Sequence, residues 1–212
     1  MSQVRSREPL PERALLPARA ASDGTRRRLL EEALILFGDR GYHGVSVREI
    51  AQAAGIKASS LYSHLKSKEQ LLYQLMQIGH EEQLERLRGA LLESSAEPGD
   101  QIAHLVRAHV VMHAAFPELS RICNREMAAL SPPSFEQVDA VRQSAVQVFV
   151  DVIERGIRLG AFSPHDPWLV TAALGAMGIR VAEWWDGAGT YDVEEVASTY
   201  GRYALQILQG PG

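Results

Sequence analysis

Hydrogen-bonding and basic side chains gather in one short stretch of the chain, between residues 46 and 70. The candidates are Ser46, Arg48, Lys57, Ser59, Ser60, Tyr62, His64 and Lys68. Hydroxyl groups and a helix N-terminus hydrogen-bond to phosphate oxygens, and lysines neutralise phosphates and release counterions. At the front of a helix, Lys57 or Ser59 can also reach base edges in a major groove. The residue types therefore favour contact with double-stranded DNA.

A capping box and a glycine predict the helix at the start of this stretch. In such a box the Ser46 hydroxyl accepts the third helical amide, and the Glu49 side chain returns to the Ser46 amide. Gly55 comes where the helix must end, because a residue without Cβ enters the left-handed conformation at low cost. We therefore expect a short helix between Ser46 and Gly55.

Two more helices are predicted after the glycine. Leu61 and Leu65 lie at i and i+4, so a helix starting near Ala58 buries this face and leaves its polar side chains on the surface. Ser67 followed by Gln70 is another capping signal, which predicts a longer helix from there. Two short helices around a turn, with a third directly behind them, are typical of a helix-turn-helix.

The stretch also resembles the DNA-binding signature of the tetracycline-repressor (TetR) family of transcriptional regulators. The resemblance rests on Ala54-Gly55-Ile56, Leu61-Tyr62, His64 and Ser67-Lys68-Glu69, and the segment from Thr25 to Gly41 extends it. It implies operator contacts by Ser60, Tyr62, His64 and Lys68. It implies phosphate or groove contacts by Ser46 and Arg48. The alternative interpretation is that Tyr62 and His64 only pack and cap.

The chain departs from the family pattern at two places. Lys57 stands where the family usually has a serine or threonine cap, and Leu65-Lys66 replaces the usual Phe-Pro pair. Lys57 would then exchange a helix cap for a DNA contact.

Charge is distributed unevenly along the chain, whose formal net charge is -4. Residues 1–70 hold 12 Lys and Arg against 8 Asp and Glu, whereas residues 71–212 hold 10 against 18. All three lysines, Lys57, Lys66 and Lys68, fall in or beside the second short helix. Such asymmetry predicts that only one end of the molecule meets nucleic acid. Residues 1–22 show no periodicity and are interpreted as a flexible basic arm, either solvated or reaching a minor groove.

The rest of the chain carries helical periodicity throughout, and no stretch alternates as a strand does. We predict an all-α fold of about nine helices, with a three-helix DNA-binding domain at 23–66 and a ligand-binding and dimerisation bundle at 67–212. The helix from Ser67 to about Glu93 connects them. Further helices are expected at about 102–115, 117–130, 135–159, 167–186 and 192–208. No apolar run reaches the roughly 18 residues of a membrane span, so a cytoplasmic protein is expected.

The C-terminal part resembles one TetR subgroup in particular. The resemblance rests on the segment from Ala173 to Asp186, on Gly189, and on the segment from Val193 to Leu205. This subgroup includes repressors of fatty-acid and steroid degradation, and it implies an acyl-CoA thioester as effector. Small residues such as Gly175 and Gly178 suit a close crossing at a dimer axis, so we expect a homodimer through the last two helices. The alternative is packing within one subunit.

A ligand of this kind needs an apolar pocket with arginines at its mouth. Arg121 and Arg125 lie at i and i+4 and could clamp phosphates, or instead form salt bridges to Glu118 or Glu126. Candidate pocket residues are Met112, Phe116, Met127, Val146, Phe149, Met177, Arg180, Trp184 and Trp185. The alternative is that these residues belong to the core, since apolar residues at helical spacing are more often core than pocket lining.

Enzymatic and metal chemistry find little support in the sequence. His109 and His113 lie at i and i+4, near His104, but no acidic or cysteine pattern completes a metal site. Ser163-Pro-His165-Asp166 contains the letters of a triad, yet contiguous residues cannot adopt its geometry and are better interpreted as a helix cap. The single cysteine, Cys123, excludes an internal disulfide. No metal or cofactor is therefore expected.

These patterns together predict a homodimeric, ligand-responsive repressor that reads a palindromic operator and is not an enzyme. The effector would be hydrophobic, such as an acyl-CoA. Alternatives are a drug- or antibiotic-sensing repressor of the same fold, and an adaptor that does not bind DNA.

Overall fold

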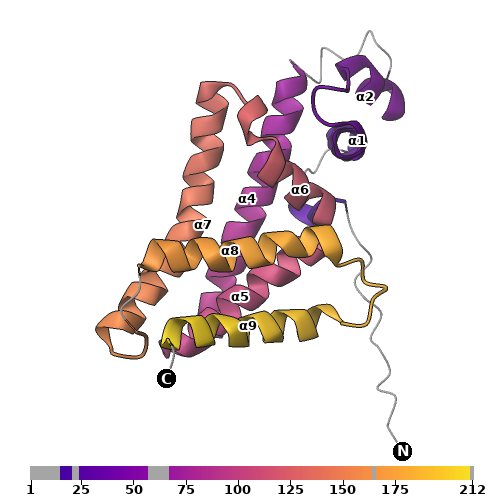
Figure 1. The fold of residues 1–212 in the computed structure, drawn as a ribbon. Coiled ribbons are helices and arrows are strands. Elements are labelled where there is room, and N and C mark those ends of the chain that lie inside the picture. Colours follow the sequence, from indigo (N-terminus) through magenta and orange to yellow (C-terminus); the bar gives the residue numbers. More distant parts are fainter. Residues whose placement is uncertain (1–14, 21–23, 57–66, 164–165, 211–212) are drawn as a thin grey trace, which may run out of the picture.

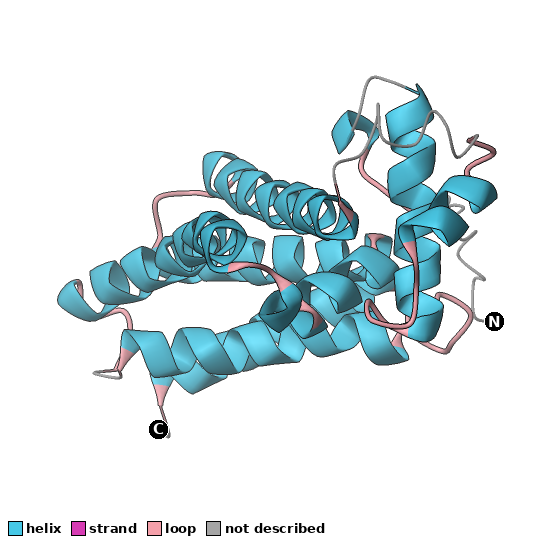
Figure 2. Cartoon of the chain, turned by 90° about the horizontal axis from the view of Figure 1, so that it is seen from above, coloured by secondary structure: helices cyan, strands magenta, loops and turns pink. Residues whose placement is uncertain are grey.

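The computed structural model describes residues 15–20, 24–56, 67–163 and 166–210, and within them every regular element is helical (Figures 1 and 2). The α-helices are α1 (Gly24–Arg40), α2 (Val47–Ala53), α4 (Lys68–Glu93), α5 (Pro98–Ala115), α6 (Pro117–Arg125), α7 (Pro132–Arg158), α8 (Pro167–Trp184) and α9 (Val193–Gln209). Two 3₁₀ turns are η1 (Ala18–Ala20) and η2 (Met127–Ala129). The predicted all-α fold is confirmed. None of the described helices has the length and apolarity to cross a bilayer.

The predicted caps around the DNA-binding domain are present. The Ser46 hydroxyl accepts the Glu49 amide and the Glu49 carboxylate accepts the Ser46 amide, which completes the capping box of α2. Gly55 has φ +69°, the left-handed conformation that its position required. Ser67 caps α4 by accepting the amide of Gln70.

Prolines explain why several helices differ from the predicted bounds. Pro98 and Pro132 occupy the first turns of α5 and α7, where the missing amide costs nothing, so both helices begin earlier than predicted. The helix predicted to reach Leu130 ends instead at Arg125, and η2 follows it. Leu130 and Ser131 are extended, as residues leading into a proline pair must be.

The long helix α4 joins the two ends of the molecule (Figure 1). The helices α1 and α2 lie at its N-terminal end, and α7 packs along it. The helices α8 and α9 cross below, with α5 packed against both of them and against α4. One connecting helix therefore contacts both the DNA-binding domain and the bundle.

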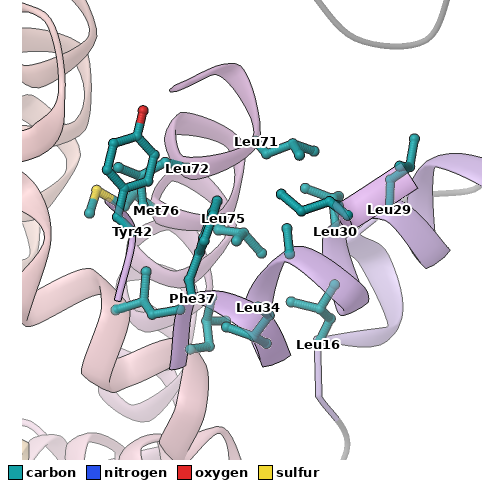
Figure 3. Close-up of a cluster of buried hydrophobic side chains, with 14 of the residues drawn as sticks. Leu16, Leu29, Leu30, Leu34, Phe37, Tyr42, Leu71, Leu72, Leu75 and Met76 are labelled. Atoms are coloured by element: carbon teal, nitrogen blue, oxygen red, sulfur yellow. The ribbon is translucent and has the colours of Figure 1, made fainter. Parts of the chain in front are cut away.

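Two separate hydrophobic cores lie along α4. The first contains Leu71 to Met76 of α4 with the buried faces of α1, α2 and α6 (Figure 3). The second contains Leu84, Leu87 and Ala90 with the buried faces of α5, α7, α8 and α9. Residues 79–83 of α4 lie between the two cores.

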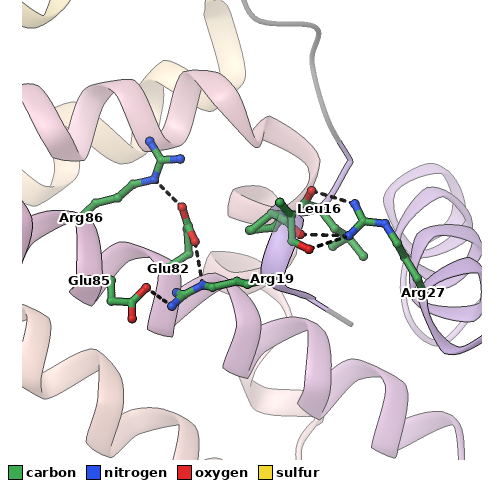
Figure 4. A network of polar contacts seen from close by, with 8 residues as sticks. Leu16, Arg19, Arg27, Glu82, Glu85 and Arg86 are labelled. Carbon is green, nitrogen blue, oxygen red and sulfur yellow. Dashed lines mark hydrogen bonds and ion pairs between the residues drawn. The ribbon is translucent and has the colours of Figure 1, made fainter. Parts of the chain in front are cut away.

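A short segment of the predicted arm, residues 15–20, is packed against the protein. Leu16 is fully buried in the first core. The guanidinium of Arg27 in α1 donates to the carbonyl oxygens of Leu16, Pro17 and Ala18 (Figure 4). Arg19 forms ion pairs with Glu82 and Glu85 of α4. Residues 15–20 therefore tie α1 to the middle of α4, and the remaining residues of the arm, 1–14 and 21–22, lie outside the described residues.

Candidate DNA-binding and effector sites

The DNA-binding candidates divide into described and undescribed residues. Ser46 and Arg48 lie at the exposed start of α2, in the region predicted to face DNA. Arg40 donates to Glu49 at 2.9 Å, which braces the capping box from α1. Hydrogen bonds from Ser46, and then from Arg40, lower the pKa of Glu49 to about 2. Five candidates lie outside the described residues, namely Lys57, Ser59, Ser60, Tyr62 and His64.

Lys68 has a structural function that the sequence did not reveal. Its ammonium group donates to the carbonyl oxygens of Tyr42 and Val45, each at 2.8 Å. The same group lies 4.2 Å from the centre of the Tyr42 ring, within cation–π range. Lys68 therefore fixes the start of α4 against the loop between α1 and α2, so its effect on DNA would be exerted through the position of the helix-turn-helix.

A cavity of about 390 Å³ opens in the bundle. It is walled by α4, α5, α6, α7 and α8, and its size falls in the range of small-molecule sites. From α4 it is lined by Gly79, His80 and Gln83, which lie between the two cores, and by Leu87 of the second core. A ligand in this cavity therefore touches the connecting helix midway between the DNA-binding domain and the bundle.

Three of the predicted pocket residues, Met112, Val146 and Phe149, line the cavity. The other apolar candidates lie elsewhere. Phe116 and Met127 belong to the first core, and Met177 and Trp185 to the second. Arg180 and Trp184 are exposed on α8. The amphipathic pattern identified buried faces correctly, but it could not separate the side chains that fill a core from those that face a void.

The arginines predicted to clamp a ligand are engaged with protein groups instead. Arg121 donates to the Ala182 carbonyl at 2.8 Å and to Glu118 at 2.9 Å. Arg125 pairs with Glu183 at 2.7 Å. Neither lines the cavity. The alternative prediction of salt bridges is therefore confirmed for Arg121 and Glu118, whereas the partner of Arg125 is on α8 and is not the neighbouring Glu126.

The arginine that does line the cavity is Arg142, which sequence reasoning missed. It lies on α7 with half of its side chain exposed, and Asp139 is 3.3 Å from its guanidinium. No spacing signal marked it, because a single arginine on a helix usually indicates a solvated face. Its location at the rim is set by the packing of α7 against α4.

Polar side chains in the cavity wall were also missed, or were predicted for other roles. His80 and Gln83 come from α4, and His109 and His113 from α5, with the two α5 rings 4.4 Å apart between centres. Burial lowers the pKa of His80 to about 4 and that of His113 to about 3, and it also lowers the pKa of His109. The three rings are therefore neutral near pH 7. Polar residues interrupting the apolar face of α4 were the available sequence signal.

Gly178 serves the packing of these rings within one subunit. A Cβ atom there would collide with the imidazole of His109, so the glycine makes room for that ring. The carbonyl of Gly175 lies 3.1 Å from Nε2 of the same ring. Packing within the subunit therefore accounts for Gly178, whereas the space above the Cα atom of Gly175 is open. No group of three or more potential metal ligands occurs in the described part of the chain.

Two family models match the chain. Residues 29–75 match the model described as bacterial regulatory proteins of the tetR family, and residues 95–208 match the tetracyclin repressor-like C-terminal domain. The second match alone spans more than half of the chain and includes α5 to α8 and most of α9. The first match includes the start of α4, and the second begins just after α4 ends.

Individual proteins show the same relationship. The transcriptional repressor KstR2 of Mycolicibacterium smegmatis is 29% identical over 191 residues, which cover 87% of this chain and 89% of the relative. The structure of the ketosteroid transcriptional regulator KstR2 of Mycobacterium tuberculosis has 26% identity and a TM-score of 0.81, covering 93% of this chain and all of that one. AibR in complex with isovaleryl coenzyme A and operator DNA has 25% identity and a TM-score of 0.76, covering 89% and 100%.

Proposed function

The chain belongs to the TetR family of DNA-binding transcriptional repressors, and from that premise we propose that it is a homodimer released from a palindromic operator by an acyl-CoA thioester. The observation that carries the proposal is the position of the cavity on α4, between the core that holds the DNA-binding domain and the core of the bundle. The solved complex of AibR contains a coenzyme A thioester and operator DNA, and it supports the proposed effector class.

The connecting helix would transmit the signal. Two recognition helices must lie about 34 to 36 Å apart to enter successive major grooves. A ligand that displaces α4 at His80 and Gln83 moves its N-terminal end, where Lys68 holds the loop between α1 and α2. Segment 15–20 moves with it, because Arg19 is bound to Glu82 beside the cavity residues. Such a ligand acts only through its different affinities for the two positions of the helix.

The dimer would form through α8 and α9. Large apolar side chains are exposed on both helices, namely Leu169, Trp184, Tyr203 and Ile207. Exposed apolar residues grouped on adjacent helices mark an interaction surface, and two copies of this pair build a four-helix arrangement. Charged substitutions at Leu169 and Ile207 are expected to give monomers in sedimentation velocity and to abolish binding to a two-half-site operator.

Arg142 is the proposed contact for the phosphates of the carrier. It lies at the rim of the cavity, and its exposed guanidinium can reach a ligand group outside the bundle. Replacing it with glutamine is expected to weaken a thioester more than the corresponding free acid. Equal effects on both ligands would contradict this role.

Operator release measured by fluorescence polarisation tests the proposed function. The ligands are a panel of acyl-CoA thioesters, the corresponding free acids and a set of lipophilic drugs. Release by thioesters supports the proposal, whereas release by drugs alone would identify a drug-sensing repressor. Release by free acids equal to that by their thioesters would remove the case for a phosphate contact.

The DNA contacts are tested separately. Tyr62→Ala is expected to weaken operator binding and leave the dimer intact, because the tyrosine is matched to an operator-touching position. Lys68→Met is expected to weaken operator binding because the helix-turn-helix is displaced. Thermal unfolding followed by circular dichroism and limited proteolysis of the loop after α1 would detect this displacement. Unchanged operator affinity in both variants would contradict the site assignment. A steep decrease of affinity with salt distinguishes DNA binding from adaptor function.

A further inference from the structure

Three polar side chains in the cavity wall have atoms without a hydrogen-bond partner among the described residues. The atoms are Nε2 and Oε1 of Gln83, Nδ1 of His109 and Nε2 of His80. These side chains belong to residues that are only 8–9% exposed. Other polar residues of the same wall are satisfied internally: the Thr171 hydroxyl donates to the Pro167 carbonyl, and the Asn124 amide to the Ser120 carbonyl. Since buried polar groups in proteins are almost always paired, the unpaired set indicates recognition of a ligand.

The hydrogen-bonding direction of the histidines follows from their backbone partners. Nε2 of His109 lies 3.1 Å from the Gly175 carbonyl, and Nδ1 of His113 lies 2.8 Å from the His109 carbonyl. A carbonyl oxygen only accepts, so these two nitrogens carry the protons of their neutral rings. The opposite nitrogens, Nδ1 of His109 and Nε2 of His113, are then bare acceptors.

Acceptors therefore predominate on this wall. Nδ1 of His109 and Oε1 of Gln83 both need a donor, and the Gln83 amide nitrogen offers hydrogens with a fixed role. A hydrocarbon would leave all of these groups unpaired. A ketone or a carboxylate supplies only acceptors, and a carboxylate would also be buried beside neutral rings at a high cost.

We propose that the buried part of the effector carries a hydroxyl group, or another uncharged donor that can also accept, which donates to Nδ1 of His109 or Oε1 of Gln83 and accepts from Nε2 of Gln83. This rests on the proposed function for the cavity and specifies its ligand. The predicted class is a hydroxyacyl thioester, distinguished from the keto and the unsubstituted compound with the same carbon skeleton. Specificity of this kind is strong, because a site built to bind a hydroxyl leaves its own groups unpaired when the hydroxyl is missing.

Matched ligand triplets test the inference. Each triplet contains the hydroxy, keto and unsubstituted forms of one acyl-CoA: 3-hydroxybutyryl-, acetoacetyl- and butyryl-CoA, the corresponding octanoyl set, and the 4-hydroxy, 4-oxo and unsubstituted cyclohexanecarbonyl set. Dissociation constants are measured by calorimetry, and operator release by fluorescence polarisation. The methyl esters of the same acids form a carrier-free series. In at least one triplet the hydroxy form is expected to bind tenfold more tightly than both others.

Matched variants assign the preference to the wall. Gln83→Met keeps the length of the side chain and removes both polar atoms, so it is expected to abolish the preference for the hydroxy form. His109→Phe keeps a ring and is expected to reduce it. Gln74→Met is the control, because Gln74 lies on the same helix and also has an unpaired oxygen but does not line the cavity. The preference should persist in that variant.

The outcomes separate this inference from the proposed function. Equal binding within every triplet, or tightest binding of a keto form, overturns the inference and leaves acyl-CoA as effector. Hydroxyl preference in the methyl esters alone overturns the acyl-CoA proposal and supports the inference. A preference that survives Gln83→Met and His109→Phe overturns the assignment to this wall, and absence of binding in both series overturns both proposals.

Discussion

Two polar surfaces of the bundle differ in whether their side chains have hydrogen-bond or ion-pair partners within the protein. On α6, Arg121 and Arg125 are both bound, to Glu118 and the Ala182 carbonyl in one case and to Glu183 in the other. On the facing walls of α4 and α5, Gln83 and His109 are buried with atoms that have no partner among the described residues. The first surface stabilises the fold at its own site. The second has buried polar atoms that no protein group among the described residues pairs.

This difference indicates where ligand recognition is located. Paired arginines hold α6 against the last turn of α8, and a ligand would have to break these contacts to use them. Unpaired groups around a cavity offer hydrogen bonds without such a loss. Charge drew attention to α6 in the sequence, but the degree of pairing is the property that distinguishes a binding wall from a structural contact.

Gly178→Ala is expected to have the largest effect on this wall. The added Cβ atom would collide with the His109 ring and push it into the cavity, which should lower the free energy of unfolding by up to about 3 kcal/mol and remove the ligand response. Chemical denaturation gives the first quantity, and operator release gives the second.

Gly175→Ala is the control on the same helix. A Cβ atom there meets nothing within 4 Å, so the higher helix propensity of alanine should stabilise the monomer fold by up to about 1 kcal/mol. Equal loss of stability in both variants would show that α8 simply tolerates no side chain, and that the His109 ring is not the cause.

Acidification is expected to lower the free energy of unfolding, with the second largest effect, because it charges a buried histidine of the cavity wall. Burial lowers the pKa of His80 to about 4, so the unfolded chain binds more protons than the folded one below the ordinary pKa of 6.5. Stability is then fully present above pH 6.5 and falls as the pH falls toward 4, by up to about 2 kcal/mol between pH 6.5 and 5 for this one group. Urea titrations of the native protein and of His80→Gln at pH 7.5, 6.5, 5.5 and 5 should give a shallower dependence in the variant. Identical slopes would mean that His80 is charged in the folded state.

Substitutions of the two arginines of α6 should differ in their effect on stability, and neither should change the response to ligand. Arg121→Ala removes a bond to a backbone carbonyl and a partly buried ion pair, with an expected loss of about 1.5 kcal/mol. Arg125→Ala removes a more exposed pair and should cost less than about 0.5 kcal/mol. Thermal unfolding measures both. Loss of thioester affinity in Arg121→Ala without loss of stability would return the clamp hypothesis to α6.

Local sequence signals correctly predicted several helix ends. The capping box at Ser46, the left-handed Gly55 and the caps at Ser67, Asp166 and Asp192 are each set by neighbours within a few residues, so they could be inferred without the fold. The starts of α5 and α7 were predicted too late, because a proline that breaks one helix can also occupy the first turn of the next.

The cavity could not be predicted in the same way. Which side of α4 faces a void depends on how α5, α7 and α8 pack around it, and the helical pattern alone does not separate His80, which lines the cavity, from Met76, which lies in the first core. Lys68 illustrates the same limit, since its partners Tyr42 and Val45 lie more than twenty residues away and no local pattern predicts these contacts.

Gln83→Met should raise the stability of the ligand-free protein, and this modest effect is the most direct measure of the contrast between the two surfaces. Both polar atoms of the Gln83 amide are buried without a partner among the described residues, whereas methionine of similar length fills the space without needing one. A buried unpaired amide costs roughly 1–3 kcal/mol, part of which water in the cavity recovers, so the expected gain is about 1 kcal/mol in urea denaturation. The same substitution should weaken the response to the effector. A binding site lowers the stability of the ligand-free protein, so removing its polar group raises stability and reduces function. Arg121→Ala predicts the opposite combination, a less stable protein that still responds. If Gln83→Met were instead destabilising, the amide would be paired in the folded protein, and the cavity wall would be a structural contact of the same kind as α6.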